Sequence, residues 1–173
     1  MKVSHLMGLC LLFLLSGCGI TAPSHNAGYA DLDGLSWRDV DATLSFSLGP
    51  RVLGFAALLI EDDPQTKALL QNLDGVRVKV YEIEGDPGDV AGDLNYMSAQ
   101  LREAGWEPVI LVREEGETTH VLIRMDEDRI AGLTVLTSDA LEVVLVNVMG
   151  ELRPELFTQT MATLDLPAPD IDV

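Results

Sequence analysis

The sequence predicts an α+β fold, a mostly antiparallel sheet with helices packed on one of its faces. Four strand-like segments joined by short turns follow residue 105, and connections this short force neighbouring strands to run antiparallel. Segments with helical patterns stand before and after them, and helices that cover one face of such a sheet make an α+β arrangement. The length of 173 residues favours one domain over two.

The first part of the expected domain contains one strand and two helices. Thr and Ser alternate with Leu and Phe over 42–48, which is the period of a half-buried strand. A Gly-Pro pair then starts a helix over 50–60, whose short apolar core VLGFAALLI predicts a buried helix rather than a membrane span. Asp63 and Pro64 supply an N-cap and a first residue for a second helix, which extends to about Leu73.

The second part contains a long helix and the rest of the sheet. Valine recurs at every second position over 76–80 and predicts a strand that continues to Ile83. Asp86 and Pro87 start an amphipathic helix that Gly105 ends. Later strands are expected at Trp106–Arg113, Thr118–Met125, Ile130–Thr137 and Leu141–Met149, and a last helix at Pro154–Leu164. The expected order is therefore β-α-α-β-α-β-β-β-β-α.

The first 17 residues have the pattern of a signal peptide. Lys2 and the terminal amine form a positive start, and Leu6–Leu15 is an apolar stretch too short to span a bilayer. The tetrapeptide Leu15-Ser16-Gly17-Cys18 resembles the lipobox that closes the signal of bacterial lipoproteins. The alternatives are an ordinary secretory signal with a stray cysteine, or a buried apolar helix.

The resemblance to a lipobox implies that residues 1–17 are removed and that Cys18 carries a diacylglyceryl thioether. Cys10 is lost with the signal, so the mature chain has no free thiol, no disulfide and no cysteine metal site. Two or three acyl chains would anchor the protein stably in a membrane of the cell envelope. Gly19, in place of Asp, resembles the class sorted to the outer membrane, facing the periplasm, in bacteria with two membranes.

The segment after the signal is expected to be a flexible tether. Residues 18–40 are rich in Gly, Ala, Ser, Asn and Asp and show no hydrophobic period. As a coil, roughly twenty such residues would reach on the order of 25 Å, enough to hold a domain over 41–173 just off the membrane.

The chain is strongly acidic, with 11 Lys and Arg against 28 Asp and Glu and a formal charge of −17. Such a surface repels phosphates, which argues against DNA, RNA and anionic lipid headgroups as ligands. Aromatic residues make up only 5% of the chain, so stacking platforms for single-stranded nucleic acid are few. The acidic surface has two alternative roles: its clustered acids bind cations weakly, or they only keep the domain soluble.

No constellation of residues predicts catalysis, a metal or another cofactor. The sequence lacks a G-x-S-x-G elbow and a phosphate-binding glycine loop, and one histidine in the expected domain, His120, cannot make a zinc site. We interpret His120 as a solvated strand histidine rather than a general base, on the strand face opposite Val121 and Ile123. The sheet face that no helix is expected to cover carries apolar residues with Arg113, Thr119 or His120 among them. The polarity of this face therefore stays open.

The acidic clusters have structural interpretations. Asp31-Leu32-Asp33-Gly34 opens like a calcium loop, but its glycine stands fourth instead of sixth and Ala42 occupies the twelfth position. Acids at 61–63 suit a helix cap, and those at 126–128 suit a hairpin turn.

The expected domain resembles a known bacterial family. The stretches that carry the resemblance are LLQNLDGVRVKVYEIE, GWEPVILVREEGE and VVLVNVMGELRPELFTQTMATLDLP. On these, the chain from about Ala42 onward is similar to the bacterial lipoprotein family catalogued as domain of unknown function 4252. The resemblance implies a small lipoprotein with an N-terminal lipobox, and it transfers no activity.

These features predict a lipid-anchored, non-enzymatic envelope protein whose domain is a protein-interaction or binding module for an unidentified envelope partner. The sheet face or the long edge strand is the expected contact surface. A carrier or sensor of a small apolar ligand, held between the sheet and the helix over 52–60, is the alternative. An enzyme that uses His120 is the third hypothesis.

Overall fold

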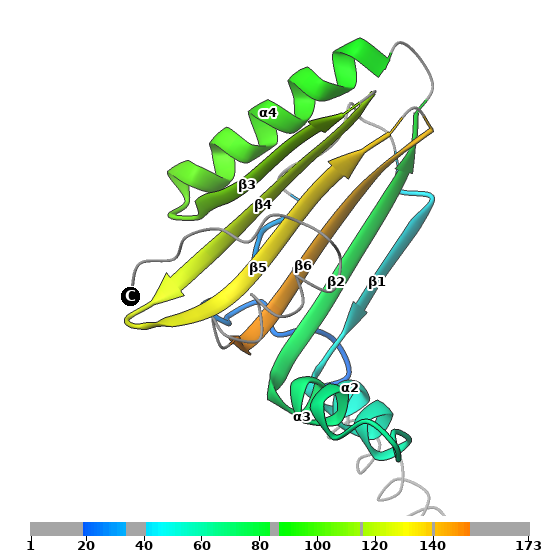
Figure 1. The fold of residues 1–173 in the computed structure, drawn as a ribbon, viewed down its shortest axis with the longest axis vertical. Coiled ribbons are helices and arrows are strands. Elements are labelled where there is room, and N and C mark those ends of the chain that lie inside the picture. The colour runs from blue at the N-terminus through cyan, green and yellow to red at the C-terminus, as the bar shows by residue number, and fades with distance from the viewer. Residues whose placement is uncertain (1–18, 34–40, 84–86, 115, 140, 153–173) are drawn as a thin grey trace, which may run out of the picture.

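The computed structural model describes residues 19–33, 41–83, 87–114, 116–139 and 141–152. Its strands form one antiparallel sheet in the order β1-β2-β6-β5-β4-β3 (Figure 1). The strands are β1 (Leu44–Leu48), β2 (Leu73–Glu82), β3 (Glu107–Glu114), β4 (Glu117–Asp126), β5 (Arg129–Ser138) and β6 (Glu142–Leu152). The predicted α+β fold and the predicted meander of its last four strands are confirmed. The helix expected over 154–164 lies outside the described residues.

Three helices occur in the described part of the chain: α2 (Pro50–Leu58), α3 (Pro64–Asn72) and α4 (Pro87–Glu103). Proline stands at the first position of both α2 and α3, where its missing N–H costs nothing. Asp63 caps α3, because its carboxylate accepts hydrogen bonds from the backbone N–H groups of Gln65 and Thr66. The predicted starts of both helices are therefore confirmed.

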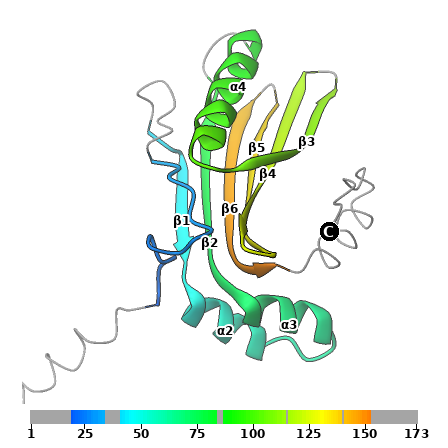
Figure 2. The ribbon, with the colours of Figure 1, turned by 90° about the vertical axis from the view of Figure 1, so that its left-hand side faces the viewer.

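Helix α4 lies on one face of the sheet, which we call the covered face, and builds the main core there (Figure 2). It contacts β3, β4 and β5. Gly105 follows its end with a φ of 88°, a left-handed conformation that glycine adopts without strain. The core comprises Val90, Leu94, Met97 and Leu101 of α4 together with Tyr81, Trp106, Leu122, Leu136, Val143 and Leu145.

Helices α2 and α3 lie at one end of the sheet, the lower end in Figure 1, and not over a face. Within α2, Leu53 and Ala57 are buried, and the helix contacts α3 and β2. Phe55, Leu58 and the capping residue Leu59 are exposed. The prediction of a buried helix is therefore wrong, because a helix that is apolar on every side finds partners here on one side only.

The N-terminal segment, residues 19–33, packs on the covered face of the sheet. Ala30 and Leu32 are completely buried and belong to the same core as α4. The flexible tether expected over 18–40 is therefore wrong for the N-terminal segment, and the packed domain begins well before residue 41. The remainder of that stretch, 34–40, lies outside the described residues.

The closest approach of this segment to the sheet is at Gly28. A Cβ atom on Gly28 would stand 1.9 Å from the carbonyl oxygen of Ala131, and one on Gly132 would stand 2.6 Å from Gly28. No side chain fits between two backbones at this separation, so both positions require glycine.

Candidate functional site

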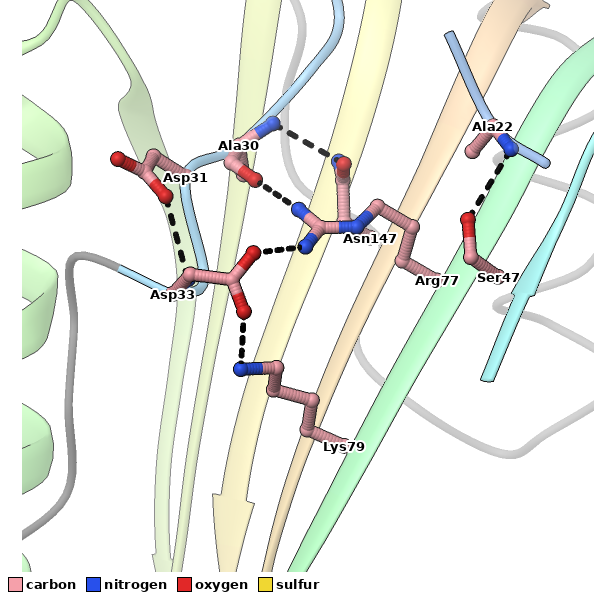
Figure 3. A network of polar contacts seen from close by, with 8 residues as sticks. All are labelled: Ala22, Ala30, Asp31, Asp33, Ser47, Arg77, Lys79 and Asn147. Atoms are coloured by element: carbon pink, nitrogen blue, oxygen red, sulfur yellow. Dashed lines mark hydrogen bonds and ion pairs between the residues drawn. The ribbon is translucent and has the colours of Figure 1, made fainter. Parts of the chain in front are cut away.

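A network of polar side chains joins the N-terminal segment to β2 and β6 (Figure 3). Arg77 is 8% exposed and donates hydrogen bonds to the carbonyl oxygen of Ala30 at 2.7 Å and to Asp33 Oδ2 at 2.6 Å. Lys79 pairs with the other carboxylate oxygen of Asp33. One carboxylate of the N-terminal segment thus bridges two cations of β2.

Asn147 forms the buried half of the network. Its Oδ1 accepts a hydrogen bond from the N–H of Ala30 at 3.0 Å, and its Nδ2 donates to the carbonyl oxygen of Gly28 at 3.0 Å. The same Nδ2 lies 3.2 Å from the carbonyl oxygen of Leu133 and 3.3 Å from Thr134 Oγ1. A completely buried amide must satisfy its donors and acceptor inside the protein, and Asn147 does so by binding the N-terminal segment.

The ion pairs fix the charges of this network. The hydrogen bond from Lys79, with the charges of Lys79 and Arg77, lowers the pKa of Asp33 against the opposing effect of partial burial. Partial burial disfavours the charged form of Lys79, but its contacts with Asp33 and Tyr81 together raise its pKa. Both groups stay charged at neutral pH. Because donors and acceptors are directed at one another, the network serves to hold the N-terminal segment on the sheet.

His120 also lies on the covered face, opposite Val121 and Ile123 as predicted, but it is only 5% exposed. The interpretation as a solvated histidine is therefore wrong. Its register neighbours on β3 and β5 are Leu111 and Leu136, and its buried Nε2 has no hydrogen-bond partner. Burial, and to a lesser degree the charge of Arg113, lowers the pKa of His120. The imidazole therefore packs as a neutral ring.

The acids of the β4–β5 hairpin lie in a turn, as predicted. Glu127 has a φ of 56°, and Arg129 stands 3.7 Å from Asp126 and 3.6 Å from Glu151. Asp126, Arg129 and Glu151 border a polar hollow of about 340 Å³ at the end of the sheet. Nowhere in the described ranges do three or more His, Cys, Asp or Glu side chains gather as they would around a metal ion.

The second face of the sheet is almost entirely aliphatic, and we call it the aliphatic face. Residues directly opposite one another in antiparallel strands point to the same side, so the register defines three rows across the sheet. The middle row is Phe46, Val78, Val146, Val135, Val121 and Ile110, and the outer rows are Leu44, Val80, Val144, Thr137, Thr119 and Val112, and Leu48, Val76, Val148, Leu133 and Ile123. The register also pairs Ile123 with Glu107 of β3, so the third row ends on one charged side chain at this edge of the sheet, and the other side chains of the rows are uncharged.

No helix or loop among the described residues covers the aliphatic face (Figure 2). Exposure rises across it, from 5% at Val121 of β4, through half-buried valines on β5, β6 and β2, to 39% at Phe46 and 50% at Leu44 on β1. Val121 and Ile110 are buried, so the accessible part of the middle row extends from Phe46 on β1 to Val135 on β5, and with strands about 4.8 Å apart it spans roughly 14 Å. Apolar surfaces of this extent on soluble proteins mark interaction sites.

The sequence did not settle on which sheet face Arg113, Thr119 and His120 lie, and the register of the strands assigns each of them. Arg113 and His120 lie on the covered face, where Arg113 donates a hydrogen bond to Asn95 Oδ1 of α4 at 2.9 Å. Thr119 lies on the aliphatic face, and its Oγ1 is 2.7 Å from the Oγ1 of Thr137. Apart from Glu107 at the β3 edge, these two hydroxyls are the only polar side-chain groups in the three rows, and they bond to each other.

The lipobox residues, 15–18, lie outside the described residues. The first described residue, Gly19, accepts a hydrogen bond on its carbonyl oxygen from the N–H of Arg51 at 3.0 Å, at the start of α2. In the described part of the chain, no helix has the length and apolarity needed to cross a bilayer.

Comparison with known proteins gives one finding. A search of curated proteins produced no match. The sequence profile described as "Domain of unknown function (DUF4252)" matches residues 37–159, which include every helix and strand described above and exclude the N-terminal segment. The chain therefore belongs to the family of domain of unknown function 4252, as the stretches LLQNLDGVRVKVYEIE and GWEPVILVREEGE predicted.

Proposed function

We propose that this is a lipid-anchored envelope protein whose non-enzymatic domain binds a partner protein through the aliphatic face. The observation that carries the proposal is the set of three rows, uncharged from β1 to β4, that no described helix covers. A wide, flat apolar surface is complementary to a similar surface on another protein, whereas small ligands bind in concave sites. The partner expected here presents an apolar strand or helix face.

The lipobox supports the anchor. An acylated Cys18 would hold the domain at a membrane of the envelope, facing the periplasm if the lipid lies in an outer membrane. The mass of the N-terminal peptide tests acylation directly. The Cys18→Ala variant is expected to stay unprocessed or to leave the membrane, and normal membrane retention of this variant would contradict the anchor.

The two other hypotheses have less support. Helix α2 lies at the end of the sheet, so it does not form a ligand site with the sheet face, as the small-ligand hypothesis requires. A catalytic His120 would need a ring nitrogen that reaches substrate, and Nε2 of His120 is buried.

Site-specific photo-crosslinking in living cells tests the contact surface. We expect a photoreactive residue at Phe46 to give one reproducible protein adduct. The control is the same residue at Leu111, which is 54% exposed on the edge strand β3 and shares a register position with His120 of the covered face. Position 111 is expected to give no adduct.

The adduct also identifies what covers the aliphatic face. An adduct of twice the mass of the chain would name a second copy as the partner. A crosslink only to residues 153–173 of the same chain, or equal adducts from both positions, would contradict binding of a partner at this face.

A further inference from the structure

We infer that α2 docks onto the lipid surface that holds the anchor, with Phe55, Leu58 and Leu59 in the membrane interface. The inference deepens the proposed function and rests on the acylation of Cys18. It adds a second membrane contact and with it an orientation of the domain.

The apolar patch on α2 faces away from the domain. Phe55, Leu58 and Leu59 follow the i, i+3, i+4 spacing that places side chains on one side of a helix. They are 63%, 65% and 69% exposed, whereas Leu53 and Ala57 on the opposite side are buried. Exposed large apolar side chains grouped on one helical turn are unfavourable in water and favourable at a lipid interface.

The structure ties the start of the mature chain to α2. The carbonyl oxygen of Ile20 accepts a hydrogen bond from the N–H of Gly49 at 2.6 Å, beside the bond from Arg51 to Gly19. A Cβ on Gly49 would stand 2.4 Å from the carbonyl oxygen of Thr21, so the two backbones are in direct contact. Ile20 itself is 52% exposed. The acyl chains on the residue bonded to Gly19 would therefore enter the bilayer beside α2.

The distances allow both contacts at once. A helix rises about 1.5 Å per residue, so the patch, four to eight residues after Arg51, lies roughly 6–12 Å along α2 from Arg51. Interfacial helices bury their apolar side about 5–10 Å into the boundary between headgroups and acyl chains. An anchor at one end of α2 thus places the whole helix within reach of that layer.

Charge indicates which lipid surface fits. Arg51 is the one charged residue of α2, and the exposed acids Glu61, Asp62 and Asp63 lie three to five residues after its last residue, Leu58. Anionic headgroups would be repelled by these acids, whereas a zwitterionic surface would not. We therefore assign a zwitterionic phospholipid surface as the occupant of the patch. Docking there orients the domain with the α2 and α3 end of the sheet at the membrane (Figure 1). In this orientation the aliphatic face is not in contact with lipid.

A single thiol reports the docking in the full chain. Processing removes Cys10 and acylation blocks Cys18, so a Leu58→Cys variant would carry one free thiol for an environment-sensitive fluorophore. The matched control is Leu141→Cys, which replaces another exposed leucine, 76% exposed, at the opposite end of the sheet. Both lipoproteins are reconstituted in vesicles of phosphatidylethanolamine and phosphatidylcholine, with part of the lipid spin-labelled on its acyl chains.

We expect a blue shift and strong quenching by the spin-labelled lipid at position 58, and neither at position 141. Replacing part of the lipid with phosphatidylglycerol is expected to weaken the quenching at position 58. A fluorophore at 58 that stays in water while the N-terminal peptide is acylated would overturn the docking and leave the anchor intact. A blue shift at 58 that depends on protein concentration and not on lipid would assign the patch to a second copy, which also overturns the inference.

Vesicle flotation separates the docking from the anchor. A chain that starts at residue 18 with serine in place of Cys18 has neither the signal nor an acyl group, and it is expected to bind the same vesicles weakly through the patch. Adding Leu58→Ser and Leu59→Ser is expected to reduce that binding about tenfold, because two leucines that are 65% and 69% exposed lose their apolar contact with lipid. Binding that is unchanged by the two serine substitutions would contradict the inference whatever the state of Cys18.

Discussion

The two faces of the sheet differ in how their polar groups are used. The covered face carries α4, the N-terminal segment and a polar network in which Asn147 and Arg77 bond the backbone of that segment and Arg77 pairs with Asp33. The aliphatic face carries three rows with one charge, Glu107 at the β3 edge, and one pair of hydroxyls. The same strands supply both faces, because successive residues of a strand alternate between them.

This difference separates the residues that stabilise the fold from the residues that contact a partner. Buried hydrogen bonds and ion pairs are costly to break, since the groups left behind have no water to bind. Half-buried valines on a flat face lose little when exchanged for residues of the same shape. We therefore expect substitutions on the covered face to act on folding and those on the aliphatic face to act on binding.

The largest effect is expected from Asn147→Ala. This change leaves the N–H of Ala30 and the carbonyl oxygen of Gly28 without their partner in the interior, and it should lower the free energy of unfolding by about 3 kcal/mol. Val146→Thr, the next residue on the same strand but on the aliphatic face, is the control and should cost about 1 kcal/mol or less. Denaturant midpoints of both variants measure the difference, and equal losses would contradict the division between the faces.

Arg77→Met should have a smaller effect. Methionine keeps the apolar stem but removes the hydrogen bond to Ala30 and the contact of the guanidinium with the Tyr29 ring, whose centre lies 4.5 Å from the guanidinium carbon. We expect a loss of about 1–2 kcal/mol, and faster proteolysis of the N-terminal segment than of the rest of the domain. Unchanged proteolysis would show that Arg77 does not hold this segment.

Acid should weaken the covered face in two ranges of pH. The pKa of His120 is lowered from 6.5, so the unfolded chain takes up this proton first and stability begins to fall below about pH 6.5. The pKa of Asp33 is lowered from 3.8, so the stability from its ion pairs is complete above about pH 4 and is lost as the pH falls further. Unfolding midpoints against pH measure both ranges: His120→Leu should remove the loss in the first, and Asp33→Asn should reduce the loss in the second. A variant with an unchanged profile would contradict the assignment for that residue.

The smallest effect is expected from His120→Leu at pH 7. The buried Nε2 has no partner to lose, and an aliphatic side chain suits a position between Leu111 and Leu136. The free energy of unfolding should stay within about 1 kcal/mol of the wild-type value. A loss well above this would mean that the imidazole makes a contact the chain depends on.

Local patterns in the sequence predicted most of the fold. Alternation in β2 and β6, proline at the start of α2 and α3, and Gly105 after α4 act over a few residues, so they can be recognised in one sequence. The same alternation, Val76 to Val80 against Arg77 and Lys79, already separated the two faces of β2.

Three features depended on contacts between distant residues. The N-terminal segment has the composition of a tether, and it is fixed by Asn147, which lies 117 positions after Ala30. The exposure of Phe55 and Leu58 depends on where α2 lies relative to the sheet. When a helix is apolar on every side, its sequence pattern does not predict which side packs against the rest of the domain. The burial of His120 likewise depends on what covers its strand.

The most direct test compares two adjacent residues of β2. Val78 stands opposite Phe46 on the aliphatic face, and Lys79 points to the covered face. With a photoreactive residue at position 46, Val78→Ser should strongly reduce the protein adduct, whereas Lys79→Ser should leave its yield unchanged. Equal yields in the two variants, or a loss confined to Lys79→Ser, would contradict the claim that the aliphatic face is the contact surface.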